Sequence, residues 1–85
     1  MCIRDSPNPF NPVTQIKYEI LKPGEFSILI FDLKGNLIEK ILEDDFHTPG
    51  LYRAKWSGQN KSSGVYFIVL RSSQSEAIRK VILLK

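Results

Sequence analysis

One stretch of the chain decides the fold, and it reads Gly64-Val65-Tyr66-Phe67-Ile68-Val69-Leu70-Arg71. An unbroken apolar run that follows a glycine is typical of a strand buried on both faces in the middle of a sheet. The sequence therefore predicts a central β-strand over residues 64–71. No apolar run of the chain approaches the roughly 20 residues that a membrane-spanning helix needs, so no membrane-spanning segment is expected.

The segments before this strand alternate with the period of two that β-strands show. Residues 14–21 place Ile16, Tyr18 and Ile20 on one face, which predicts a half-buried strand. Residues 26–31 are apolar at almost every position, which predicts a strand buried on both faces.

One further segment is ambiguous. The apolar residues of 37–42 are spaced like one face of a helix, but the segment is shorter than most helices and follows a hairpin turn at Gly35. We therefore predict a strand there, followed by an acidic loop over residues 43–50. Residues 52–56 and 77–84 alternate again and predict two more strands.

The predicted elements describe an all-β domain. Six main strands, with a further short one near Phe10, predict a small antiparallel sandwich of six to seven strands, similar to immunoglobulin or fibronectin type III domains. A chain of 85 residues has the length of one domain, and its composition of 42% hydrophobic and 25% charged residues is that of a globular protein. The prolines of residues 7–12 predict a stiff, extended opening.

The first six residues, Met1-Cys2-Ile3-Arg4-Asp5-Ser6, read like the in-frame translation of a transposase-style sequencing adapter. We therefore assign residues 1–6 to an artefact and residues 7–85 to the domain, and we expect the chain to be the tail of a larger protein. Cys2 is the only cysteine, so neither an internal disulfide nor a metal site built on several cysteines can form.

Residues with the chemistry for catalysis are few. His47 is the only histidine, and its polar surroundings beside Asp44 and Asp45 predict a solvated loop residue rather than a catalytic base. The adjacent acids of residues 43–45 have oxygen ligands for calcium, but they lack the alternating spacing of calcium-binding loops, so a solvated acidic loop is expected instead. No enzymatic activity, metal or cofactor is predicted.

Carbohydrate and nucleic acid are two ligand classes for which the sequence favours simpler interpretations. Tyr52, Trp56 and Tyr66 would form a platform for carbohydrate if they were exposed together, but the alternation of residues 52–56 predicts that they belong to the core. The net charge of +3 is a mild bias, and no aromatic residues clearly interleave with the basic ones on a solvent face. Nucleic acid is therefore not an expected partner.

Five motifs occur along the chain in a recognisable order. They are Pro7-Asn8-Pro9-Phe10-Asn11-Pro12, Phe31-Asp32-Leu33-Lys34-Gly35, Pro49-Gly50-Leu51-Tyr52 with Trp56, Ser63-Gly64-Val65-Tyr66-Phe67, and Arg79-Lys80-Val81-Ile82-Leu83-Leu84-Lys85. Together they resemble the C-terminal sorting domain (type A) of the type IX (Por) secretion system, over residues 7–85. The same motifs also resemble the immunoglobulin-like domain of flagellar hook-capping proteins.

The resemblance to the sorting domain implies a function without catalysis. Such a domain directs an upstream cargo protein from the periplasm across the outer membrane, and it is cleaved by a sortase-like peptidase after export. The implied partners are the outer-membrane translocon, that peptidase and the covalently fused cargo, and the implied location is the cell surface or the medium. The alternative is a structural or adhesive immunoglobulin-like module of an extracellular protein.

Carried over by position, the candidate sorting residues fall into two groups. Those expected to serve mainly as scaffold are Pro7, Pro9, Gly35, Gly64 and Tyr66, and Asn8 is a further candidate without an assigned role. Those with the stronger expectation of a role in recognition are Lys80 and Lys85.

Overall fold

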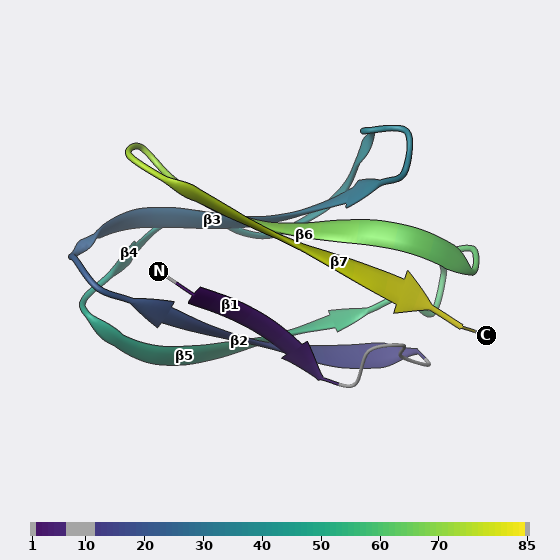
Figure 1. Ribbon diagram of the computed structural model, residues 1–85, viewed down its shortest axis with the longest axis horizontal. Helices are drawn as coiled ribbons and strands as arrows, with labels where there is room; N and C mark the ends of the chain where they lie inside the picture. The colour runs from purple at the N-terminus through teal and green to yellow at the C-terminus, as the bar shows by residue number, and fades with distance from the viewer. Residues whose placement is uncertain (1, 7–11, 85) are drawn as a thin grey trace.

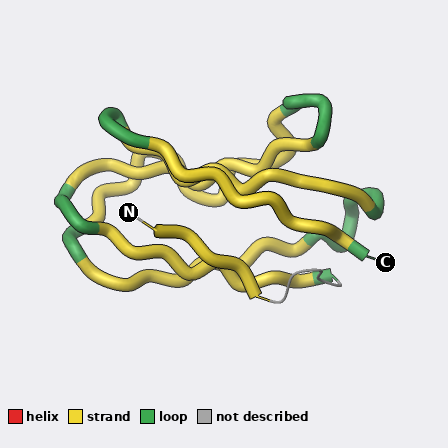
Figure 2. The backbone as a smooth tube through the Cα atoms, viewed as in Figure 1, coloured by secondary structure: helices red, strands yellow, loops and turns green. Residues whose placement is uncertain are grey.

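Seven β-strands make up the computed structural model, which describes residues 2–6 and 12–84 (Figure 1). The strands are β1 (Cys2–Ser6), β2 (Val13–Ile20), β3 (Gly24–Asp32), β4 (Leu37–His47), β5 (Gly50–Ser57), β6 (Gly64–Ser72) and β7 (Glu76–Leu83). They form a three-stranded sheet in the order β1-β2-β5 and a four-stranded sheet in the order β4-β3-β6-β7, with every pairing antiparallel. The sheets face each other as two layers connected by short turns, which confirms the predicted sandwich (Figure 2).

The core lies between the two sheets because each inner face carries every second residue of its strands. β6 is an interior strand of the four-stranded sheet, between β3 and β7, as its apolar run predicted, but Val65 and Phe67 on its outer face are only half-buried. The buried cluster consists of Ile16, Tyr18, Ile20, Phe26, Ile28, Ile30, Trp56, Tyr66, Ile68, Leu70, Val81 and Leu83.

Trp56 lies at the centre of this core rather than on a carbohydrate platform. Its side chain is fully buried, and the ring of Tyr66 meets it edge-on at 5.2 Å between centroids. The indole Nε1–H donates a hydrogen bond to the carboxylate of Glu39 at 3.1 Å, so the one polar group of the ring is satisfied. The prediction of a core position is confirmed for Trp56 and Tyr66, whereas Tyr52 is half-buried and packs against the core.

The predicted loop over residues 43–50 is wrong for its first five residues, because β4 continues to His47. The register pairs Phe26 with Asp45 and Gly24 with His47, after an irregularity in which Asp44 adopts φ 48°. The Asp44 N–H donates to the Ser27 hydroxyl at 3.0 Å, which compensates for the interrupted ladder. An edge strand can carry adjacent acids because one side of it faces water, so an acidic composition did not exclude a strand.

The expectation that residues 26–31 are buried on both faces holds only in part. In β3 the outward Leu29 is buried as predicted, but Phe31 is only half-buried, so that strand is not covered evenly on both faces. The expected short strand near Phe10 lies outside the described residues. Residues 2–6 form β1, which pairs with β2 from Cys2–Glu19 to Ser6–Gln15. This pairing does not test their assignment to an adapter, because a backbone ladder accepts almost any side chains.

Candidate functional site

The candidate sorting residues that the structure describes gather at one end of the four-stranded sheet. The register pairs Gly64 with Leu83 and Phe67 with Lys80 across β6 and β7, and it pairs Asp32 with Tyr66 across β3 and β6. We call this part of the molecule, comprising residues 32–36, 64–67 and 80–83, the Gly64 end. Figure 1 shows the β3–β4 turn, the start of β6 and the arrowhead of β7 together on the right. Positions far apart in the sequence thus become neighbours.

Gly35 has a structural task in the turn from β3 to β4. Its φ of 88° is a conformation that residues with a side chain rarely adopt, and its N–H donates to the Asp32 carbonyl at 3.0 Å. The Asp32 carboxylate accepts the N–H groups of Asn36 at 2.8 Å and Lys34 at 2.9 Å. These bonds favour the charged carboxylate, and the one from Asn36 is the main reason that the pKa of Asp32 is lowered.

Gly64 and Tyr66 also serve the scaffold. Gly64 begins β6 with φ 153°, which again favours glycine. The side chain of Tyr66 is buried, and its hydroxyl donates to the Ser62 carbonyl at 2.6 Å, so it secures the loop before β6. The expected scaffold roles of Gly35, Gly64 and Tyr66 therefore each have a physical basis.

Lys80 differs from these three residues because its side chain is exposed on the outer surface. Val81 and Leu83 are fully buried on the inner face of β7, so Lys80 and Ile82 point the other way. A partner can reach Lys80, which fits a role in recognition. Pro7, Asn8, Pro9 and Lys85 lie outside the described residues, and their roles stay predictions.

His47 is a buried residue, and the expectation of a solvated loop histidine is wrong. Only 5% of its surface is exposed, because it ends β4 with its ring between Phe26 and Tyr52. Its Nδ1 lies 2.9 Å from the Asp45 carbonyl, and because a carbonyl can only accept, Nδ1 carries the hydrogen. In the neutral ring Nε2 is then the acceptor, and the Tyr18 hydroxyl donates to it at 2.9 Å.

The cluster around His47 holds the sheets together rather than providing a catalytic base. Both ring nitrogens are engaged in hydrogen bonds, one of them to β2 of the opposite sheet. Burial, followed by the charge of Asp45, raises the pKa of the Tyr18 hydroxyl above its usual value of 10.0. The sequence signal for this cluster is weak, since a single histidine close to three consecutive acidic residues is typical of a loop.

The acidic residues of β4 do not form a metal site. The Glu43 carboxylate forms an ion pair with Lys40 at 2.6 Å. The backbone carbonyl of Asp45 accepts a hydrogen bond from His47. Among the described residues, no group of three or more His, Cys, Asp or Glu side chains is arranged to hold a metal ion. In the same part of the chain, no helix is both long enough and apolar enough to span a bilayer.

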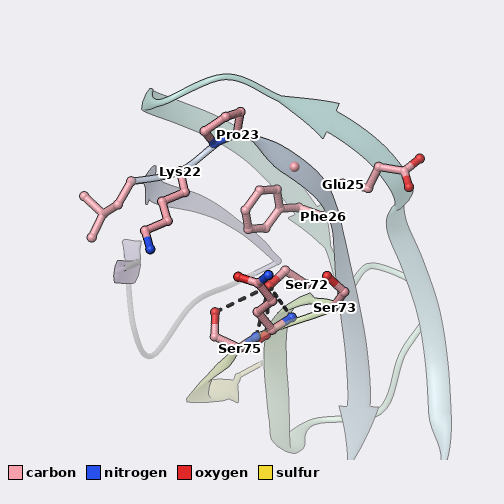
Figure 3. Close-up of a pocket in the computed structure, with 10 residues that line it drawn as sticks. Lys22, Pro23, Glu25, Phe26, Ser72, Ser73 and Ser75 are labelled. Carbon is pink, nitrogen blue, oxygen red and sulfur yellow. Dashed lines mark hydrogen bonds between the residues drawn. The ribbon is translucent and has the colours of Figure 1, made fainter.

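A pocket of about 340 Å³ lies at the end of the molecule opposite the Gly64 end, between the β2–β3 turn and the β6–β7 turn (Figure 3). The ring of Phe26 projects into it, and Ser72 and Ser75 approach from the second turn. The Ser72 hydroxyl accepts the N–H groups of Gln74 at 3.3 Å and Ser75 at 3.1 Å. These polar groups complete a turn, so the pocket presents no arrangement for catalysis.

A comparison with protein families finds a match to the secretion system C-terminal sorting domain over residues 6–84. A search of curated proteins finds no match to the chain. The family match covers the candidate sorting residues except Lys85.

Proposed function

The chain belongs to the family of secretion system C-terminal sorting domains, and we propose on this basis that it directs an attached cargo protein across the outer membrane. The observation that carries the proposal is the family match, which spans residues 6–84. Membership implies a C-terminal sorting role in type IX secretion, interaction with the secretion machinery, and export to the cell surface or the medium.

The structure supports a role in recognition rather than in chemistry. A sorting signal needs a folded surface that a receptor can contact, and the sandwich provides two outer sheet faces and several turns. The polar groups buried at His47 and Tyr66 are engaged in structural hydrogen bonds. The family is in general non-catalytic, which agrees with this interpretation.

The finer steps of the route are part of the proposal. The domain is recognised by the outer-membrane translocon, and a sortase-like peptidase then cleaves it from the cargo. The cargo is released into the medium or attached to the cell surface. Lys80 is the described sorting candidate whose exposed side chain best suits contact with a receptor, and Lys85 is its expected companion.

A reporter fusion tests this function. The full chain is placed at the C-terminus of a fluorescent reporter that is targeted to the periplasm of a type IX-competent bacterium and of its translocon-deficient mutant. We expect reporter at the surface or in the medium of the competent strain only. Retention in the periplasm of both strains, with the domain folded, would instead favour a structural or adhesive module, as the resemblance to hook-capping domains implies.

The structure also dictates how the C-terminal residues should be tested. Deleting residues 80–85 removes the fully buried Val81 and Leu83, so loss of export could simply reflect loss of folding. Substitution of Lys80 by Ala keeps the buried Val81 and Leu83 in place and removes an exposed charged side chain. Substitution of Lys55 by Ala, an exposed lysine on β5 of the other sheet, is the matched control.

A further inference from the structure

The outer faces of the two sheets differ sharply in polarity. On the three-stranded sheet, β2 and β5 turn polar residues outward, among them Gln15, Lys17, Arg53 and Lys55. On the four-stranded sheet, most outward positions from the middle of the sheet toward the Gly64 end are apolar. They are Leu29 and Phe31 of β3, Leu37 of β4, Val65, Phe67 and Val69 of β6, and Ile78 and Ile82 of β7. We call these residues the outer apolar face.

The outer apolar face is not flat. A shallow hollow of about 340 Å³ lies across β3, β6 and β7, and Phe31, Phe67, Val69 and Ile78 line it. Ile78 is 59% exposed at its border, although it is a large apolar side chain. The hollow begins beside Gly35 at the β3–β4 turn and ends at the ion pair between Arg71 and Glu76, 2.7 Å apart. Of the other residues of this face, Leu37 is exposed, Phe31, Val65, Phe67 and Ile82 are half-buried, and Leu29 and Val69 are buried. An apolar face that is left partly open to solvent in this way is typical of an interaction surface.

Cations border the outer apolar face on both of its long sides. Lys40 lies opposite Leu29 on the edge strand β4, and Lys80 lies opposite Phe67 on the edge strand β7. These two edge strands are three strand spacings apart, about 14 Å, so the lysines lie on either side of the apolar residues of β3 and β6. Lys40 is paired with Glu43 at the surface, and such an exposed pair is easily rearranged when a partner binds.

The hollow and the two flanking lysines favour one kind of binding partner for this face over others. A second copy packed face to face would bring lysines against lysines around the outer apolar face, which is unfavourable. A lipid surface takes apolar groups that protrude from the protein, whereas the centre of this face is hollow. A protein surface with a protruding apolar side chain, bordered by carboxylates, satisfies both the shape and the charge.

We propose that the outer apolar face is where this domain docks on the secretion machinery, against an apolar protrusion bordered by carboxylates. This inference rests on the proposed function and adds to it the contacting surface and the chemistry of the partner. Lys80 then acts as one border of a docking surface, and Ile78 is an apolar contact that the family motifs did not indicate.

Paired substitutions test the proposal. Ile78→Glu places a carboxylate on the outer apolar face, and Leu51→Glu places one at an 83% exposed position on β5 of the other sheet. Lys80→Glu and Lys55→Glu form a second pair that reverses charge at exposed sites. In the reporter assay we expect the variants at positions 78 and 80 to lower export about tenfold, which is the effect of losing one contact in an interface. We expect export of the variants at positions 51 and 55 to remain within about twofold of the parent.

A crosslinking measurement identifies the occupant. A photoreactive amino acid at position 78, or at position 51 as the control, is introduced into the reporter fusion in type IX-competent cells, and the crosslinked proteins are identified by mass spectrometry. We expect position 78, and not position 51, to crosslink to a component of the secretion machinery. Crosslinks from position 78 to a second copy of the chain or to lipid would overturn the proposal.

The two proposals fail in different ways. If the parent fusion is retained in both strains, the proposed function fails. If the parent is exported by the translocon, and folded variants at positions 78 and 80 are exported equally well, the sorting function stands and the docking surface is wrong. Folding of each variant is checked by circular dichroism and urea denaturation, and Lys80→Glu keeps the test decisive if Ile78→Glu does not fold.

Discussion

The hydrogen bond from Tyr18 to His47 connects the two sheets at the level of single residues. Tyr18 belongs to β2 and His47 to β4, and both side chains are buried. Each polar group of the pair is satisfied only while the other is present, because water is excluded from this part of the core. We therefore expect the pair to control how tightly β4 is held against the opposite sheet.

Tyr18 makes the stability of the domain sensitive to alkaline pH. Its pKa in the folded state is raised above 10.0, so the unfolded chain loses the proton more readily. The stability that the protonated Tyr18 hydroxyl contributes is fully present below pH 10. It is lost as the pH rises through the pKa of Tyr18 in the folded state. We predict that the free energy of unfolding falls above pH 10, and that it falls less in Tyr18→Phe. Urea denaturation followed by Trp56 fluorescence at a series of pH values measures this.

At neutral pH we expect Tyr18→Phe to lower the free energy of unfolding for a separate reason. Tyr18→Phe leaves Nε2 of His47 without a donor in the core, which we expect to cost about 1–3 kcal/mol. Equal stability of the parent and the variant at pH 7 would contradict the buried hydrogen bond. An equal alkaline loss in both would contradict the raised pKa of Tyr18.

At the scale of elements, the β3–β4 turn depends on backbone conformation at Gly35. A Cβ atom placed there would have no neighbour within 4 Å, so the cost of a side chain is conformational rather than steric crowding. We predict that Gly35→Ala lowers the free energy of unfolding by about 1–2 kcal/mol, and that Gly35→Asn costs less because asparagine tolerates positive φ. Chemical denaturation of both variants checks this ranking, and the reverse ranking would contradict it.

The terminal strand gives a second prediction at this scale. Deleting residues 81–85 removes Val81 and Leu83 from the core and three of the eight residue pairs of the β6–β7 ladder, and we expect the truncated domain to be unfolded at 25 °C. Lys80→Ala should keep the stability of the parent to within about 0.5 kcal/mol, because it changes an exposed position. Circular dichroism compares the three proteins. A folded truncated chain would show that β7 is dispensable.

The strands differ in how well the sequence predicts them. β2, β5 and β6 follow from alternation or from an apolar run, because the inner face of each is buried against the opposite sheet. The second half of β4 does not, since an edge strand tolerates acids and an irregular residue such as Asp44. The burial of His47 could not be predicted either, because it depends on Tyr18 and Tyr52 from the opposite sheet.

For the whole molecule, stability should depend strongly on Trp56. A sandwich of this size has only about 3–5 kcal/mol of stability, and truncating a fully buried tryptophan costs about the same amount. We predict that Trp56→Ala is largely unfolded in water and that Trp56→Phe is intermediate. Circular dichroism during urea denaturation measures both, and an unchanged midpoint for Trp56→Ala would contradict a core position.

The candidate site was predictable only in part, because its residues come together through the sheet register. Gly35, Gly64, Tyr66 and Lys80 could be chosen from motifs, but their common location follows from the pairing of β3, β6 and β7. The outer apolar face could not be recognised from the sequence, since an apolar run does not tell which residues will be covered. Only the two-layer architecture shows that one face of β6 is left toward solvent.

The central claim is that this folded domain carries the signal for export. The most direct measurement is the fraction of a C-terminally fused reporter that added protease can reach on intact cells, or that is found in the medium, in type IX-competent and translocon-deficient strains. The account predicts reporter outside the outer membrane in the competent strain only. Equal fractions in the two strains, with the domain shown to be folded, would contradict it.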